Sequence, residues 1–226
     1  MQKDWPSELR IVAMFLLLDI VLVCTHLLSG SQLFDLDSEQ NIPTFYQSFK
    51  LMLLAGLAAL HLYRLIRDRN TGTLERTFWG MFAAGALFLG LDEALTIHEN
   101  AGALLSGIIG SEGTQTYTEI FTAGGFTSSN WLLFYLPLLI AVLVSIVYFA
   151  RKLYPSFGRK RVILLLAAAG LFGATFALEF IGTKTGIWMT SVYELIMITE
   201  ETAEMMSVNL LLYFVISSGH EQHKTG

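Results

Sequence analysis

The segment WGMFAAGALFLGLDEALTIHEN, residues 79–100, places an uncharged apolar run directly before a group of ionisable side chains. With the residues that precede it, the run approaches the length of about 20 residues that crosses a bilayer. It ends in four ionisable residues with no lysine or arginine nearby, namely Asp92, Glu93, His98 and Glu99. Charged groups in hydrocarbon are costly and are usually functional. The segment therefore predicts a membrane helix and a candidate site together.

The composition of the whole chain is that of a membrane protein. The 226 residues are 54% hydrophobic and 15% charged, whereas soluble domains carry about 25% charged residues. The single cysteine, Cys24, excludes an intramolecular disulfide and a cysteine-rich metal site. The sequence has no basic patch interleaved with aromatic residues, which would indicate nucleic-acid binding. The expected partner is the lipid bilayer.

Apolar runs predict an all-α polytopic membrane protein with one six-helix transmembrane domain over residues 1–226. The first run follows Arg10 and lacks an A-x-A-like cleavage site, so we expect a retained helix and not a signal peptide. The six predicted helices span about 10–29, 45–66, 77–98, 130–153, 161–181 and 188–216.

The distribution of basic residues predicts the orientation. Four arginines lie in the 64–76 connection and five basic residues lie in the 151–161 connection, out of 14 in the chain. By the positive-inside rule, these loops and both termini are cytoplasmic, in an inner (plasma) membrane protein. We assign Lys50 and Lys184 to the remaining loops, so no basic partner is expected within the bilayer.

Small residues in the fifth predicted helix indicate a close helix–helix contact. Gly170 and Ala174, like Gly173 and Ala177, follow the small-xxx-small spacing that lets two membrane helices approach closely. We expect this face of the helix to pack tightly against a neighbour.

The sixth predicted helix carries four glutamates on one side. At 100° per residue, Glu194, Glu200, Glu201 and Glu204 fall within an arc of about 120°. In the third helix the same arithmetic places Asp92 and Glu99 on one face, with Glu93 and His98 on either side of it. Asp19, His26 and Glu179 reach the same outer depth on other helices and are secondary candidates.

Acids without basic partners in a bilayer require protons, water or a cation to neutralise them. Carboxylates with an imidazole favour Fe or Mn, with Zn or Ca less favoured. The Glu-x-x-His pairs of carboxylate-bridged dimetal bundles are absent. The candidate metal ligands are Asp92, Glu93, His98, Glu99, Glu194, Glu200, Glu201 and Glu204.

Two motifs, DEALTIHE at 92–99 and EETAEMM at 200–206, resemble bacterial multi-pass membrane proteins of unassigned function. Those proteins carry a D-E-x-x-x-x-H-E signature and a later E-E-x-x-E-M signature. The matching residues here are Asp92, Glu93, His98, Glu99, Glu200, Glu201, Glu204 and Met205. The resemblance implies that these residues belong to one group, and it implies no activity.

Three functions are compatible with this pattern. The first is binding of a divalent metal in the outer half of the bundle, as in a membrane metalloenzyme that acts on a lipid-soluble or periplasmic substrate. The second is a proton- or cation-coupled transporter or channel that uses the same acids as a relay. The third is a non-catalytic subunit of a larger membrane complex. The sequence leaves open whether the chain is an enzyme, which residues are catalytic and whether it forms a homo-oligomer.

Overall fold

The computed structural model describes residues 7–68, 71–98, 100, 107, 119–120, 122–125, 130–184, 186–187 and 190–221, without the side chains of 7, 130–134, 220 and 221. These residues form long helices and no β-strand. The elements are α1 (Ser7–Ser29), the 3-10 turn η1 (Gln32–Phe34), α2 (Ile42–Arg67), α3 (Thr73–Leu95), α5 (Asn130–Lys152), α6 (Tyr154–Gly182) and α7 (Ser191–Glu221).

Five of these helices are long and apolar enough to cross a membrane, which confirms an all-α protein of the membrane type. They are α1, α2, α3, α5 and α6. The remaining long helix, α7, has 31 residues and carries the four glutamates singled out above. It is not one of the five, so the sixth span stays a prediction.

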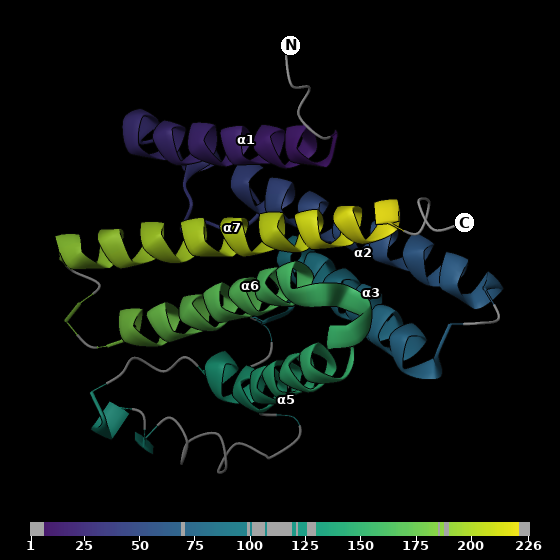
Figure 1. Cartoon of the computed structure of the whole chain (residues 1–226). Coiled ribbons are helices and arrows are strands. Elements are labelled where there is room, and N and C mark those ends of the chain that lie inside the picture. Colours follow the sequence, from purple (N-terminus) through teal and green to yellow (C-terminus); the bar gives the residue numbers. More distant parts are fainter. Residues whose placement is uncertain are drawn as a thin grey trace.

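The long helices pack side by side, and α7 lies among the others (Figure 1). It contacts α1, α2 and α6, while α2 pairs with α3 and α5 pairs with α6. Because consecutive helices reverse direction, α1, α3 and α6 end where α2 and α7 begin (Figure 1). We call this end of the bundle the acidic end. The opposite end, where α2 leads into α3 and α5 leads into α6, is the basic end.

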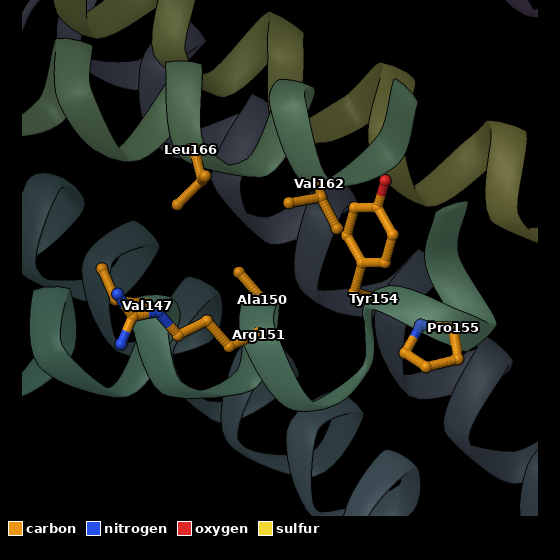
Figure 2. Close-up of a pocket in the computed structure, with 7 residues that line it drawn as sticks. All are labelled: Val147, Ala150, Arg151, Tyr154, Pro155, Val162 and Leu166. Carbon is orange, nitrogen blue, oxygen red and sulfur yellow. The ribbon is translucent and has the colours of Figure 1, made fainter. Parts of the chain in front are cut away.

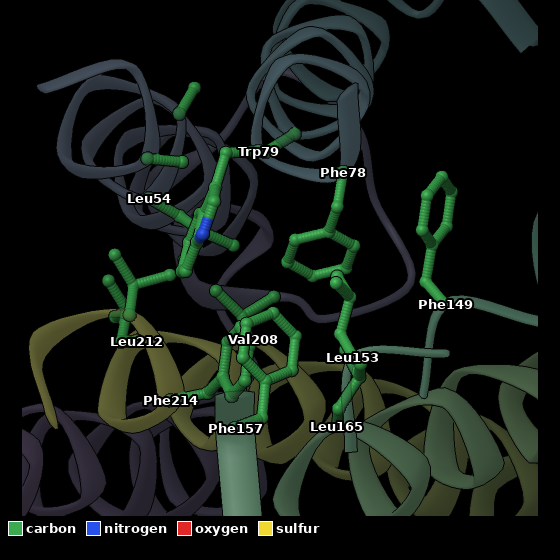
Figure 3. Packing of buried hydrophobic residues seen from close by; sticks show 14 of the residues in the cluster. Leu54, Phe78, Trp79, Phe149, Leu153, Phe157, Leu165, Val208, Leu212 and Phe214 are labelled. Carbon is green, nitrogen blue, oxygen red and sulfur yellow. The ribbon is translucent and has the colours of Figure 1, made fainter. Parts of the chain in front are cut away.

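An aromatic cluster fills the core toward the basic end (Figure 3). It consists of Phe78 and Trp79 from α3, Phe149 from α5, Phe157 from α6 and Phe214 from α7. The ring centroids of Trp79 and Phe214 lie 5.5 Å apart, and those of Phe78 and Phe157 lie 5.1 Å apart. Trp79 and Phe214 have no exposed surface. Large rings contribute heavily to packing energy, so this cluster joins four helices into one body.

The third helix ends earlier than its apolar pattern predicts. Thr96 has a φ of 51° and ψ of 42°, the left-handed conformation, and its N–H donates to the carbonyl of Asp92. A residue in this conformation commonly terminates an α-helix. The α-helix thus stops at Leu95, slightly before the predicted limit of about 98, and residues after Thr96 follow a new direction.

The predicted close contact on the fifth helix is also wrong at Gly170. A Cβ atom built at Gly170 meets nothing within 4 Å among the described residues, and one at Gly173 comes only into ordinary contact, 3.8 Å from Leu143. The close approach lies instead at Gly90 of α3. A Cβ there would lie 3.1 Å from Cγ of Met52 and 3.2 Å from Cβ of Leu51.

Candidate functional site

The loop between α1 and α2 folds over the acidic end of the bundle. Asn41 fixes the exit of this loop, because its side-chain oxygen accepts from the N–H of Thr44 at 3.2 Å and caps α2. The loop brings two acids to other elements. Asp37 accepts from the hydroxyl of Tyr193 at 2.9 Å, and Oε1 of Glu39 lies 3.6 Å from Nε2 of His98.

His98 lies between two acids at the end of α3. Its Nδ1 is 3.4 Å from Oδ2 of Asp92, while Glu39 faces its Nε2. Asp92 is 8% exposed and also accepts from the hydroxyl of Tyr135 at 2.9 Å. In an unbroken helix Asp92 and His98 would point about 120° apart. The left-handed Thr96 lets the two side chains meet, which corrects the prediction that they lie on different faces.

These contacts make His98 a cation at neutral pH. Burial alone would lower the pKa of His98, but the side-chain contacts with Asp92 and Glu39 and the negative charges of both outweigh it. The pKa rises from 6.5 to about 10. The imidazolium therefore compensates part of the negative charge at the acidic end.

Three carboxyl groups from two helices lie close enough to interact with one another. Glu93 of α3 interacts electrostatically with Glu201 and Glu204 of α7, which also interact with each other. Nε2 of Gln47 in α2 donates to Oε1 of Glu204 at 3.2 Å. We call Glu93, Glu201 and Glu204 the carboxyl cluster.

The amide of Gln47 is incompletely satisfied at this cluster. Gln47 is 4% exposed, and its Oε1 atom has no hydrogen-bond partner among the described residues. A buried acceptor without a partner costs free energy unless a donor or a cation completes it. A protonated glutamate would supply such a donor if the amide turned over, because its acid hydroxyl can donate to the amide oxygen.

A second pair of acids lies beside the cluster. The carboxyl groups of Glu179 in α6 and Glu200 in α7 interact electrostatically with each other. Two neighbouring carboxylates repel each other, so a proton on either group would stabilise the pair. Glu200 also interacts electrostatically with Glu204, which links the pair to the carboxyl cluster.

The most buried charged residue among those described is a lysine that the sequence prediction placed in a loop. Lys50 lies in α2 with no exposed surface, and its Nζ donates to Oδ1 of Asp19 at 2.9 Å. The expectation of no basic partner within the bilayer is therefore wrong. Asp19 also accepts from the hydroxyl of Tyr46 at 2.7 Å and from the side-chain amide of Asn209. This group links α1, α2 and α7.

The other predicted residues lie apart from the carboxyl cluster or outside the described chain. Glu194 is exposed in the first turn of α7. Nδ1 of His26 accepts from the N–H of Leu36 at 3.1 Å, so the same atom has no proton to donate to Asp35, 3.4 Å away. Glu99 lies outside the described residues.

Sequence reasoning missed several polar partners at this site. They are Glu39, Gln47, Lys50, Tyr135 and Asn209. One signal was available, because Gln47 and Lys50 lie three residues apart inside an apolar run and so share a helix face. Their partners on α7 and α1 are set by tertiary packing and have no local sequence signal.

No three His, Cys, Asp or Glu side chains in the described part of the chain are arranged to hold one metal ion. Metal binding therefore stays a prediction. The described residues include a set of electrostatically interacting carboxyl groups, with Lys50 and His98 as the basic residues that interact with them. Such a set can hold and exchange protons or attract a cation.

Comparison with known proteins agrees with the resemblance noted in the two acidic motifs. No curated protein and no solved structure matches the chain. One family model covers residues 10–218, which include both motifs and all but the outermost residues of α1 and α7. The chain thus belongs to the family described as a domain of unknown function, DUF8692.

Proposed function

We propose that this chain is a six-span inner-membrane protein, with both termini cytoplasmic, that couples transport to the binding of protons or another cation. The binding site is the carboxyl cluster of Glu93, Glu201 and Glu204. In this proposal α7 is the sixth span, and it packs against α1, α2 and α6.

A surplus of negative charge over positive charge carries the proposal. Lys50 and His98 are the cations that interact with the acids in the described part of the site. Against them stand six carboxyl groups, those of Asp19, Glu39, Asp92, Glu93, Glu201 and Glu204. Asp19 pairs with Lys50, while Asp92 and Glu39 share His98. The cluster therefore needs protons or a bound cation to remain in a low-dielectric environment.

The proximity of Glu179 and Glu200 favours protons in particular. Because two neighbouring carboxylates repel each other, a proton on either group would stabilise the pair. A proton held there lies beside Glu204, so the pair and the cluster form adjacent proton-binding positions. Chains of acids in membrane helices serve as proton relays in pumps and transporters.

The position of the aromatic cluster favours a coupled carrier over an open channel. The acids lie toward the acidic end, and the packed rings of Phe78, Trp79 and Phe214 occupy the core toward the basic end. In this proposal the packed rings, which offer a proton no acidic or hydroxyl group, separate the acids from the basic end. In an alternating-access transporter, each conformational state opens the buried binding site to one side of the membrane only.

Proton flux in liposomes tests the proposal. The purified protein would be reconstituted with a pH-sensitive dye inside, and a pH gradient would be imposed with a potassium–valinomycin clamp. Wild-type protein should dissipate the gradient faster than empty liposomes do. The assay would be run without added cations and then with a series of cations, one at a time. Glu204→Gln should abolish this flux, because the amide cannot release a proton.

Glu194→Gln is the matched control, since it removes an exposed carboxyl group from the same helix. It should leave flux at the wild-type level. Equal flux in both variants, or no flux above empty liposomes with any cation, would refute the transport proposal. Metal analysis of the same samples addresses the metalloenzyme hypothesis: stoichiometric Fe or Mn that is lost in Glu204→Gln would favour it.

A further inference from the structure

An apolar hollow lies between the end of α5 and the start of α6 at the basic end (Figure 2). Val147, Ala150, Val162 and Leu166 form its walls, and Arg151, Tyr154 and Pro155 complete the lining. Val147, Tyr154 and Leu166 are 44%, 48% and 40% exposed. The hollow therefore opens on the outer surface of two helices that are apolar enough to span a membrane.

The local backbone creates this hollow. The short first turn of α6 ends at Gly158, where φ is 70° and ψ is 167°. This conformation is essentially restricted to glycine. The chain changes direction there, so Tyr154 and Pro155 before the glycine and Val162 and Leu166 after it line the same hollow.

Arg151 brings an uncompensated positive charge into this apolar setting. Its side chain is exposed and is directed back along α5 toward Val147 (Figure 2). Among the described residues, no acidic side chain pairs with it and no acceptor binds it. A guanidinium matches the geometry of a phosphate group, which it can bind with two parallel N–H donors.

The surroundings select an anion that also has an apolar part. Lys152, Arg159 and Lys160 are exposed close by in the chain, so the local field is positive. A free phosphate ion would pair with the positive charge but would leave the apolar walls of the hollow uncovered. A phospholipid satisfies both, and basic pockets between membrane helices are known sites for anionic headgroups.

We propose that this hollow binds one anionic glycerophospholipid from the leaflet that faces the basic loops. Its phosphate pairs with Arg151, and one acyl chain covers Val147, Val162 and Leu166. Tyr154 stands at the interface, where aromatic rings are favoured. The site is separate from the carboxyl cluster, so it stands whether or not the transport proposal is correct.

Native mass spectrometry of the detergent-purified protein tests this inference. The protein would be titrated with dioleoylphosphatidylglycerol and, separately, with dioleoylphosphatidylcholine, and the first bound lipid would be quantified. Wild-type protein should prefer the anionic lipid. Arg151→Gln should weaken the first binding event by about 5-fold, the effect of one basic residue near an anionic headgroup.

Two further variants separate a built site from diffuse attraction. Arg159→Gln removes the same charge outside the hollow and should change the first binding event less than Arg151→Gln does. Leu166→Trp fills the wall without altering charge, and it should weaken binding of the anionic lipid. Because Arg151 and Leu166 are both exposed, these variants should fold, which unchanged melting temperatures would verify. Equal losses in Arg151→Gln and Arg159→Gln, or no lipid preference in the wild type, would overturn the proposal.

Discussion

At the scale of single residues, Lys50 shows where sequence reasoning reached its limit. The residue lies inside a predicted apolar helix, yet the distribution of basic residues among the loops led to its assignment to an outer loop. Its true position depends on Asp19, which is 31 residues away in sequence and 2.9 Å away in space. Local pattern gives the cost of burying a charge, but only tertiary packing supplies the partner that offsets the cost.

The Lys50–Asp19 pair gives a stability prediction. Lys50→Met should lower the free energy of unfolding by about 3–5 kcal/mol, because it leaves Asp19 buried without its cation. The double variant Lys50→Met/Asp19→Asn should recover much of this loss, since neither buried charge remains. Chemical unfolding in detergent, followed by tryptophan fluorescence, measures both. A single variant as stable as the wild type would show that the pair is not a stabilising contact.

His98 gives a prediction of pH dependence. The group has a pKa of about 10 in the folded protein and 6.5 as its ordinary value, so folding favours the protonated form. Its contribution to stability is complete below about pH 6.5 and is lost as the pH rises through about 10. The melting temperature of the wild type should fall across this window. The melting temperature of His98→Gln should fall less steeply, because Asp92 and Glu39 in that variant have no imidazolium that deprotonates. Parallel curves for the two proteins would contradict the ion-pair assignment.

At the scale of elements, apolar runs predicted the helices well and their contacts poorly. The predicted ranges of about 45–66 and 130–153 correspond to Ile42–Arg67 and Asn130–Lys152. Hydrophobic length decides whether a segment can be a membrane helix. Which small residue meets a neighbour depends on helix rotation, and several glycines share the same local pattern. Likewise, the left-handed Thr96 has no glycine signal, so the meeting of Asp92 and His98 could not be read from helical angles.

The contact between α2 and α3 can be tested at Gly90. Gly90→Ala should lower the free energy of unfolding by about 1–3 kcal/mol, because the new methyl group overpacks against Leu51 and Met52. Ser48, which donates to the Gly90 carbonyl at 2.7 Å, would also be displaced. Gly85→Ala is the control in the same helix, because a Cβ there meets none of the described residues within 4 Å. Equal stability of the two variants would mean that the helices are not so closely packed.

At the scale of the whole molecule, the sequence predicted two chemically different ends, and the structure adds what separates them. The acids gather toward one end, the arginine-rich connections lie at the other, and the aromatic cluster fills the core between α3, α5, α6 and α7. The grouping of Glu93, Glu201 and Glu204 followed from depth along the helices. The roles of Gln47 and Lys50 did not, because they required the rotation of α2 against α7.

Orientation in the membrane is the last prediction, and it rests on this division. The basic end carries most of the lysine and arginine residues, which favour the cytoplasmic side because short basic loops resist translocation. Ser156 and Lys184 are exposed at opposite ends of α6 and suit cysteine labelling. Neighbouring Gly158 does not, since its φ of 70° would strain any other residue. In a Cys24→Ser background, a membrane-impermeant maleimide applied to intact cells should label Lys184→Cys and not Ser156→Cys, while permeabilised cells should show both. Labelling of Ser156→Cys alone in intact cells would reverse the orientation. It would also place the entrance to the carboxyl cluster on the cytoplasmic side, where protons would have to be supplied from within the cell.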